Sequence, residues 1–106
     1  MAIWTKNDVK MQIETVEQLY NMVSYYRFKN REDDFKKTLT NDFIHEAHML
    51  VIKAEDWLES YKKEYVETLS DYQMDLYRAS EEGENCESLI FIIIGYIKGA
   101  VFNKTA

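Results

Sequence analysis

Apolar side chains recur every three or four residues in the first part of the chain, which is the spacing of one helix face. They are Val9, Ile13, Val16, Leu19, Tyr20, Val23 and Tyr26. Thr5 can act as the N-cap of this helix, and Asp8, three residues later, is a favourable acid for its first turn. The polar run 29–34 ends the pattern. We therefore predict a first helix beginning near Asp8 and ending in that run, followed by a short helical segment around Phe35 and Leu39.

The middle of the chain carries one apolar stripe that keeps its phase from Phe43 to Ala79. Its members are Ile44, Ala47, Val51, Ala54, Leu58, Tyr61, Tyr65, Leu69, Tyr72, Leu76 and Ala79. At about 100° per residue they fall within a stripe roughly 100° wide. A turn would normally shift the phase, so the pattern favours one continuous helix from Asn41 to Ser80, nearly 60 Å long at about 1.5 Å per residue. The alternative is a break at Ser70, where Ser70-Asp71-Tyr72-Gln73 has the form of a capping box.

The last segment, residues 86–102, is rich in isoleucine and could form a buried strand. A lone strand has nothing to pair with, however, and no other segment alternates at period two. Gly83 marks the turn before it. Glu84 and Glu87 near its start and Lys98 near its end have the polarity that a helix dipole favours. We therefore expect a helix, apolar nearly all round, at the centre of a bundle or a dimer.

Two glycines in this last helix, Gly95 and Gly99, lie four residues apart and next to Ala100. Small side chains at this spacing let a second helix approach closely. The sequence thus predicts a close helix contact there.

The fold class follows from these elements. The chain has 106 residues, no proline and three glycines, so strong helix breakers are almost absent. We predict an all-α fold, a small helical bundle with one long central helix, forming a single domain over residues 1–106. The shorter helices could not cover a helix of about 60 Å. Apolar residues also lie outside its main stripe, namely Met49, Ile52, Val66, Met74 and Tyr77. Contacts on two sides are therefore needed, and a homodimer is the expected form.

Charge limits the classes of partner. The net charge is −6, and residues 38–88 hold four basic and thirteen acidic side chains. Such a protein repels phosphate backbones, so we expect no direct nucleic-acid binding. The most apolar run, Leu89 to Phe102, contains Lys98 and is shorter than the roughly 20 residues of a membrane span, so no membrane partner is expected. A single cysteine and the absence of an apolar stretch behind a basic start favour a cytoplasmic location.

Four acids lie on one side of the predicted long helix at positions i, i+3, i+7 and i+11. Such a ridge could meet a basic partner or imitate a phosphate backbone, and the plainer alternative is a solvated face. Tyrosine and tryptophan are favoured at interfaces, and Trp57 and Tyr77 lie off the main stripe, with Trp57 the clearest candidate for exposure. The predicted interaction residues are therefore Trp57, Glu64, Glu67, Asp71, Asp75 and Tyr77.

We find no familiar catalytic pattern in the sequence. Three glycines, for example, cannot form a glycine-rich phosphate loop. We therefore predict no catalytic residue and no cofactor. His45 and His48, three residues apart, could share a metal with Asp42 or Glu46, although two histidines at the solvent edge are the simpler interpretation.

One arrangement of acids does resemble a known family. Glu55-Asp56-Trp57-Leu58-Glu59 is followed by Glu84-Asn85-Cys86-Glu87. These segments resemble the Glu-Glu-x-x-Glu and Glu-x-x-Asp pairs of MazG-type nucleotide pyrophosphohydrolases, which are small all-helical oligomers that use magnesium. The similarity spans Leu50 to Ile94, with Asp56 in place of Glu and Glu87 in place of Asp. The resemblance implies a metal site formed by Glu55, Asp56, Glu59, Glu84 and Glu87 that holds a triphosphate.

From the residues as a whole we expect a small acidic protein-interaction module without enzymatic activity. It would act as an inhibitor, adaptor or regulatory protein, of a kind that viruses or mobile elements could encode. One alternative is a MazG-like magnesium-dependent pyrophosphohydrolase. The other is an acidic mimic of nucleic acid that blocks a basic groove.

Overall fold

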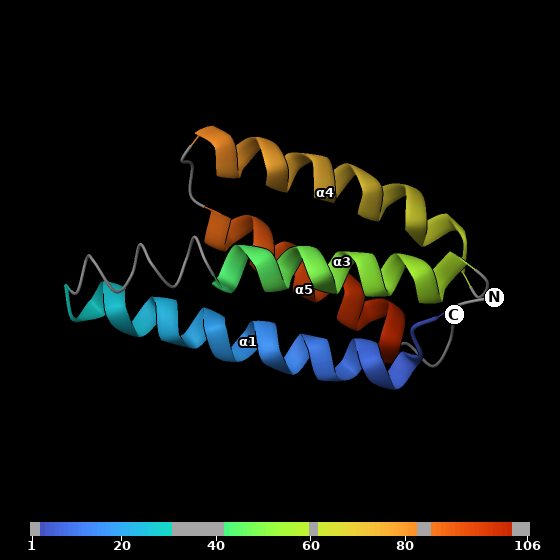
Figure 1. Cartoon of the computed structure of the whole chain (residues 1–106), viewed down its shortest axis with the longest axis horizontal. Coiled ribbons are helices and arrows are strands. Elements are labelled where there is room, and N and C mark those ends of the chain that lie inside the picture. Colours follow the sequence, from blue (N-terminus) through green and yellow to red (C-terminus); the bar gives the residue numbers. More distant parts are fainter. Residues whose placement is uncertain (1–2, 31–41, 60–61, 83–85, 103–106) are drawn as a thin grey trace.

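The computed structural model describes residues 3–30, 42–59, 62–82 and 86–102, and within these ranges the chain forms four helices and no strand. They are α1 (Lys6–Phe28), α3 (Ile44–Glu59), α4 (Glu64–Glu82) and α5 (Cys86–Phe102). Successive helices run in opposite directions and lie side by side, and α5 returns to contact α1 and α3 (Figure 1). The predicted all-α bundle is confirmed. The predicted short segment around Phe35 and Leu39 lies outside the described residues.

The first helix has the N-cap and the end that its sequence predicts, but it begins at Lys6, two residues before Asp8. The backbone N–H of Asp8 donates to the Thr5 hydroxyl over 3.2 Å, and the Thr5 N–H donates to the Asp8 carboxylate over 2.8 Å. This reciprocal pair is a capping box with Thr5 as N-cap. At the other end, the Lys29 N–H donates to the Tyr25 carbonyl over 3.0 Å, and Asn30 has a φ of 55°, a left-handed conformation that stops a helix.

The predicted continuous helix over residues 41–80 is wrong. Helix α3 ends at Glu59 and α4 begins at Glu64, and α4 runs back alongside α3 (Figure 1). The Lys62 N–H donates to the Leu58 carbonyl over 2.7 Å, while the Lys62 carbonyl accepts from Tyr65 over 3.1 Å, so one helical ladder ends and the next begins there. The longest dimension of the molecule is 43 Å, shorter than the nearly 60 Å that the predicted continuous helix would span. The alternative break is also wrong, because Ser70 lies inside α4.

The apolar stripe runs through both helices, and α3 and α4 turn its two halves toward the same core. The stripe residues that are buried are Ala47, Val51, Ala54 and Leu58 on α3 and Leu69, Leu76 and Ala79 on α4. Periodicity shows which side of a helix faces inward, and it carries no information about the direction of the axis. The charge pattern does mark the turn, since Glu64 and Glu67 occupy the first turn of α4, where the helix dipole favours acids. A hairpin needs no second copy to cover it, so the predicted homodimer loses that basis.

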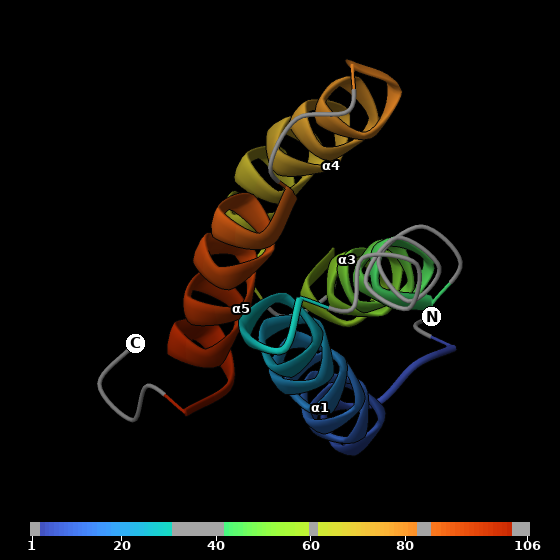
Figure 2. The same ribbon diagram turned by 90° about the vertical axis from the view of Figure 1, so that its left-hand side faces the viewer.

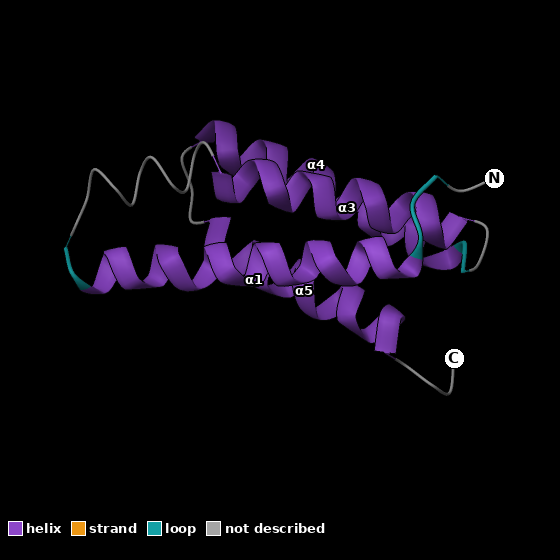
Figure 3. Cartoon of the chain, turned by 60° about the horizontal axis from the view of Figure 1, so that its bottom comes forward, coloured by secondary structure: helices purple, strands orange, loops and turns teal. Residues whose placement is uncertain are grey.

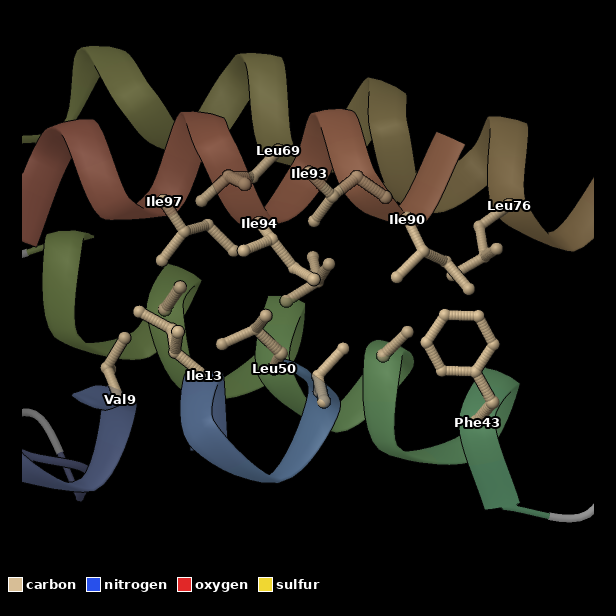
Figure 4. Close-up of a cluster of buried hydrophobic side chains, with 14 of the residues drawn as sticks. Val9, Ile13, Phe43, Leu50, Leu69, Leu76, Ile90, Ile93, Ile94 and Ile97 are labelled. Atoms are coloured by element: carbon tan, nitrogen blue, oxygen red, sulfur yellow. The ribbon is translucent and has the colours of Figure 1, made fainter. Parts of the chain in front are cut away.

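All four helices contribute to one hydrophobic core. Figure 4 shows side chains from each helix pointing into a common cluster, among them Val9, Ile13, Phe43, Leu50, Leu69, Leu76, Ile90, Ile93, Ile94 and Ile97. Phe43, immediately before α3, is wholly buried, and the Tyr20 ring packs edge-on to it with centroids 6.1 Å apart. Burying a large aliphatic or aromatic side chain contributes about 1.5–3 kcal/mol. This core holds the four helices in their relative positions.

The last segment is a helix, as predicted, but it is not buried all round. Phe91 and Ile92 are 61% and 51% exposed. A Cβ added at Gly95 or Gly99 would meet no atom within 4 Å, so the close helix contact predicted there is not made within the described part of the chain. None of the described helices is both long enough and apolar enough to cross a membrane.

Candidate interaction surface

The four acids predicted to form a ridge are all exposed on α4. At about 100° per residue they project from the side of the helix opposite the buried Leu69 and Leu76. We call Glu64, Glu67, Asp71 and Asp75 the acidic ridge. Arg78 approaches Asp75 at 3.9 Å, and both side chains are more than half exposed, so solvent screens this pair and it neutralises little of the ridge.

Two contacts fix the register of α3 against α4. The His48 ring packs on the Tyr77 ring with centroids 4.2 Å apart, and the Ser70 hydroxyl donates to the Glu55 carboxylate over 3.3 Å. From the first contact to the second the chain advances seven residues on α3 and goes back seven residues on α4, as expected for two antiparallel helices. By this register Ile52 lies opposite residue 73 and next to Met74.

An exposed apolar patch lies on this seam. Ile52, Met74 and Tyr77 are 41%, 61% and 54% exposed. The register and the helical spacing place all three on the outer side of the α3–α4 hairpin, beside the acidic ridge. We call these three residues the apolar patch. Grouped exposed apolar side chains mark interaction sites, and tyrosine and methionine are enriched at the centres of protein interfaces.

The turn end of the same face is hollowed. A shallow depression of about 540 Å³ is lined by Glu59, Lys63, Glu64, Val66 and Glu67. Three of its five side chains are carboxylates and one, Lys63, is cationic, so the depression keeps a net negative charge that suits a further cationic side chain. Among the residues that the structure describes, no three His, Cys, Asp or Glu side chains are grouped to hold a metal ion.

Burial changes the ionisation of two groups in the seam. The pKa of His48 is lowered, mainly because burial disfavours its charged form and also because His45 is near. The pKa of Glu55 is raised by burial and by the charge of Glu59, against the hydrogen bond from Ser70. His48 is therefore neutral at pH 7, and its Nδ1 is buried without a hydrogen-bond partner among the described residues.

Trp57 is not part of this surface, which corrects the prediction that it is exposed. It is half-buried and packs against the core. On α3 it shares a side with Glu46 and Lys53, and both of these bond to Gln12 of α1, at 2.6 Å and 2.8 Å. Trp57 therefore lies on the α1 side of α3, away from the seam with α4. Tyr77, the other predicted aromatic, does lie beside the ridge.

The acids that carry the MazG resemblance are divided between the two ends of the bundle where the structure describes them. Glu55 and Glu59, one turn apart near the end of α3, lie close enough for the charge of Glu59 to raise the pKa of Glu55. Asp56, near the end of α3, accepts the N–H groups of Ile3 and Trp4 at 2.7 Å and 2.8 Å. Glu87, at the start of α5, is buried and paired with Arg27 at the opposite end of the bundle (Figure 1). Glu84 lies outside the described residues.

Comparisons of the chain with protein families, with characterised proteins and with solved structures find no match. The surface must therefore be interpreted from its own chemistry. Sequence reasoning found the ridge and noted Ile52 and Met74 as apolar residues off the main stripe. It missed the contribution of α3, because contacts such as His48 with Tyr77 exist only once the hairpin closes.

Proposed function

We propose that this protein is a binding module that docks onto another protein through the outer face of the α3–α4 hairpin. In this role it acts as an inhibitor, adaptor or regulatory protein. One observation carries the proposal, namely that an exposed acidic ridge adjoins an exposed apolar patch on one face. The partner that fits is a cytoplasmic protein with a basic surface and an apolar anchor.

The two features have different roles in binding. Charges at the rim of an interface mainly guide encounter and select the partner, whereas a few buried apolar and aromatic side chains supply most of the affinity. We therefore assign partner selection to the acidic ridge and affinity to Met74 and Tyr77. The depression beside Glu59, Glu64 and Glu67 receives an arginine or lysine of the partner through charge-assisted hydrogen bonds.

A basic amphipathic helix is the ligand that best matches this face. Such a helix places cationic side chains along one edge and apolar anchors at i, i+3, i+4 and i+7 along another. Laid along the seam, its apolar side would cover Ile52, Met74 and Tyr77, and its basic edge would follow the ridge. A partner whose basic groove otherwise holds nucleic acid belongs to the same proposal, and competition with that nucleic acid would identify it.

The proposal assigns no catalysis and no cofactor to the protein. Incubation with nucleoside triphosphates and Mg²⁺ tests this directly. Turnover that is abolished by Glu59→Gln would replace the binding function with nucleotide hydrolysis.

The binding face is tested by affinity capture from cells of the source organism with matched variants as bait. Met74 and Met11 are equally exposed, at 61% and 60%, but Met11 lies on α1. We expect Met74→Ser to lose the captured partner and Met11→Ser to retain it. Asp71→Lys should likewise lose the partner while Glu14→Lys, an equivalent exposed position on α1, retains it. Equal retention by all four variants would refute the proposed face.

A further inference from the structure

The outer side of α5 carries apolar and small residues that no described helix covers. Phe91, Ile92 and Phe102 are 61%, 51% and 55% exposed, and the positions of Gly95 and Gly99 are open. Figure 2 shows α5 at one side of the bundle, between α4 and α1. This side lies away from the acidic ridge.

A groove runs beside the middle of this surface. It has a volume of about 260 Å³ between α5 and α1, with Tyr20, Phe91 and Gly95 among its lining residues. The rings of Tyr20 and Phe91 lie 5.7 Å apart, and Gly95 leaves the groove open above them. At its rim Lys98 is paired with Glu17 over 2.7 Å. The groove is large enough for one aromatic side chain.

The charges on this side are balanced, in contrast to α4. Glu17 is neutralised by Lys98, and the ammonium of Lys10 lies 5.3 Å from the ring centre of Phe102. A chain with a net charge of −6 repels its own copy wherever acidic surfaces face each other. On the α1–α5 side the acidic charge of Glu17 is already paired with Lys98, so two copies can approach there without strong repulsion. For the same reason this side offers little net negative charge to a basic partner. The charge distribution therefore favours a second copy of the chain as the occupant.

We propose that two copies of the protein pair through α5, antiparallel, about a two-fold axis at Gly95. Positions equally far from residue 95 then meet, so Phe91 packs against Gly99 of the second copy, and Phe102 packs against Ser88. Each ring faces a position with a small side chain, which is the self-complementarity that a two-fold interface requires. Exposed residues along the outer side of α5 alternate in steps of four and three, which is the spacing of residues at the contact between two paired helices. They are Ser88, Ile92, Gly95, Gly99 and Phe102.

The size of the surface sets the expected strength of the dimer. The outer side of α5 is about 25 Å long and about 10 Å wide, so it offers on the order of 250 Å² per copy, to which the flank of α1 adds. Standard stable interfaces bury about 800 Å² per partner. The dimer is therefore reversible and depends on concentration. It leaves the α3–α4 face free, so each dimer presents two binding faces to a partner.

Disulfide cross-linking tests the axis and the direction of pairing. Gly95→Cys places two thiols across the two-fold axis, so oxidation should give a covalent dimer in high yield. Ser88→Cys alone should stay monomeric, but a mixture of Ser88→Cys with Phe102→Cys should cross-link. The wild-type chain, whose Cys86 is buried, measures the background. Self-cross-linking of Ser88→Cys as efficient as that of Gly95→Cys would show parallel pairing and overturn the proposed geometry.

Sedimentation equilibrium tests the dimer without any covalent bond. The mass of the wild type should rise from one chain to two with concentration, and Gly95→Glu should remain a monomer with unchanged helical circular dichroism, since that position is open. Ser80→Glu, exposed on α4, is the control and should still dimerise. A wild type that stays monomeric, or a Gly95→Glu variant that still dimerises, would refute the dimer. Either result leaves the α3–α4 binding face untouched, whereas the Met74 and Asp71 variants test that face alone.

Discussion

The imidazole of His48 lies against the phenol ring of Tyr77, with ring centroids 4.2 Å apart and planes inclined by 31°. This contact joins α3 to α4 and, with the hydrogen bond from Ser70 to Glu55, sets the register that places Ile52 beside Met74. Because of that register, Ile52 of α3 joins Met74 and Tyr77 of α4 beside the acidic ridge. Figure 3 shows the α3–α4 hairpin on one side of the bundle, with α1 and α5 on the other. The fold thus separates a charged face from a nearly neutral one.

The hairpin predicts that two residues fifteen apart in sequence lie close in space. Glu55 and Ser70 are hydrogen-bonded over 3.3 Å, whereas one unbroken helix would hold them about 22 Å apart. A Glu55→Cys/Ser70→Cys variant should therefore be linked within the chain by a short bifunctional thiol reagent. Lys10→Cys/Tyr25→Cys has the same separation along α1 and should not be linked. Peptide mapping by mass spectrometry reads both outcomes, and absence of the 55–70 link would contradict the hairpin.

The stability of the protein should depend on pH through His48. Its pKa is lowered in the folded state, so the unfolded chain binds the proton more readily, and stability is lost as pH falls from about 6.5 through the lowered value. His48→Phe keeps a ring against Tyr77 and has no proton to bind. Chemical denaturation at about pH 7.5 and pH 5.5 should show the wild type losing stability relative to this variant. Equal changes in the two proteins would contradict the assignment.

Glu55 should act in the opposite direction at lower pH. Its raised pKa means that the folded state holds the proton more tightly, so this group adds stability as pH falls through that pKa toward its ordinary value. Glu55→Gln should remove this gain in stability at low pH. The variant therefore serves as the control for the His48 experiment, because it shows how much of the pH dependence comes from Glu55. A variant whose stability still rises over the same interval as much as that of the wild type would show that another carboxyl is responsible.

Neighbouring isoleucines on α5 give the sharpest test of the core. Ile93 is fully buried and Ile92 is 51% exposed. Ile93→Ala should lower the free energy of unfolding by about 2–5 kcal/mol, because it removes buried methyl groups and leaves a cavity. Ile92→Ala should change it by no more than about 0.5 kcal/mol in dilute solution. Urea denaturation of the monomer compares the two, and similar losses would contradict the orientation of α5.

The helical character of the chain and the inward side of each helix could be predicted from the sequence. Thr5 with Asp8 gave the start of α1, and the apolar stripe identified buried residues such as Val51 and Leu69. The turn near Lys62 could not be predicted from that stripe, because it has no glycine or proline and leaves the phase unchanged. Only Glu64 and Glu67, at the start of α4, indicated a new helix there.

The candidate surface was predicted in part for the same reason. A ridge on a single helix follows from spacing alone, so the positions from Glu64 to Asp75 could be found. Trp57 also lay off the predicted stripe, but that stripe could not show that α1 would pack against its side of α3. Contacts between helices depend on the fold, and they decide which of the off-stripe residues stay exposed.

The proposed function is tested most directly by the salt dependence of binding to the captured partner. Attraction between the acidic ridge and a basic partner is screened by salt, so affinity measured by calorimetry should fall steeply as salt rises from about 0.05 to 0.5 M. Glu67→Gln/Asp71→Gln should bind more weakly at low salt and show a shallower salt dependence, while Glu14→Gln should match the wild type. An affinity independent of salt, or identical slopes in all three proteins, would contradict binding through the ridge.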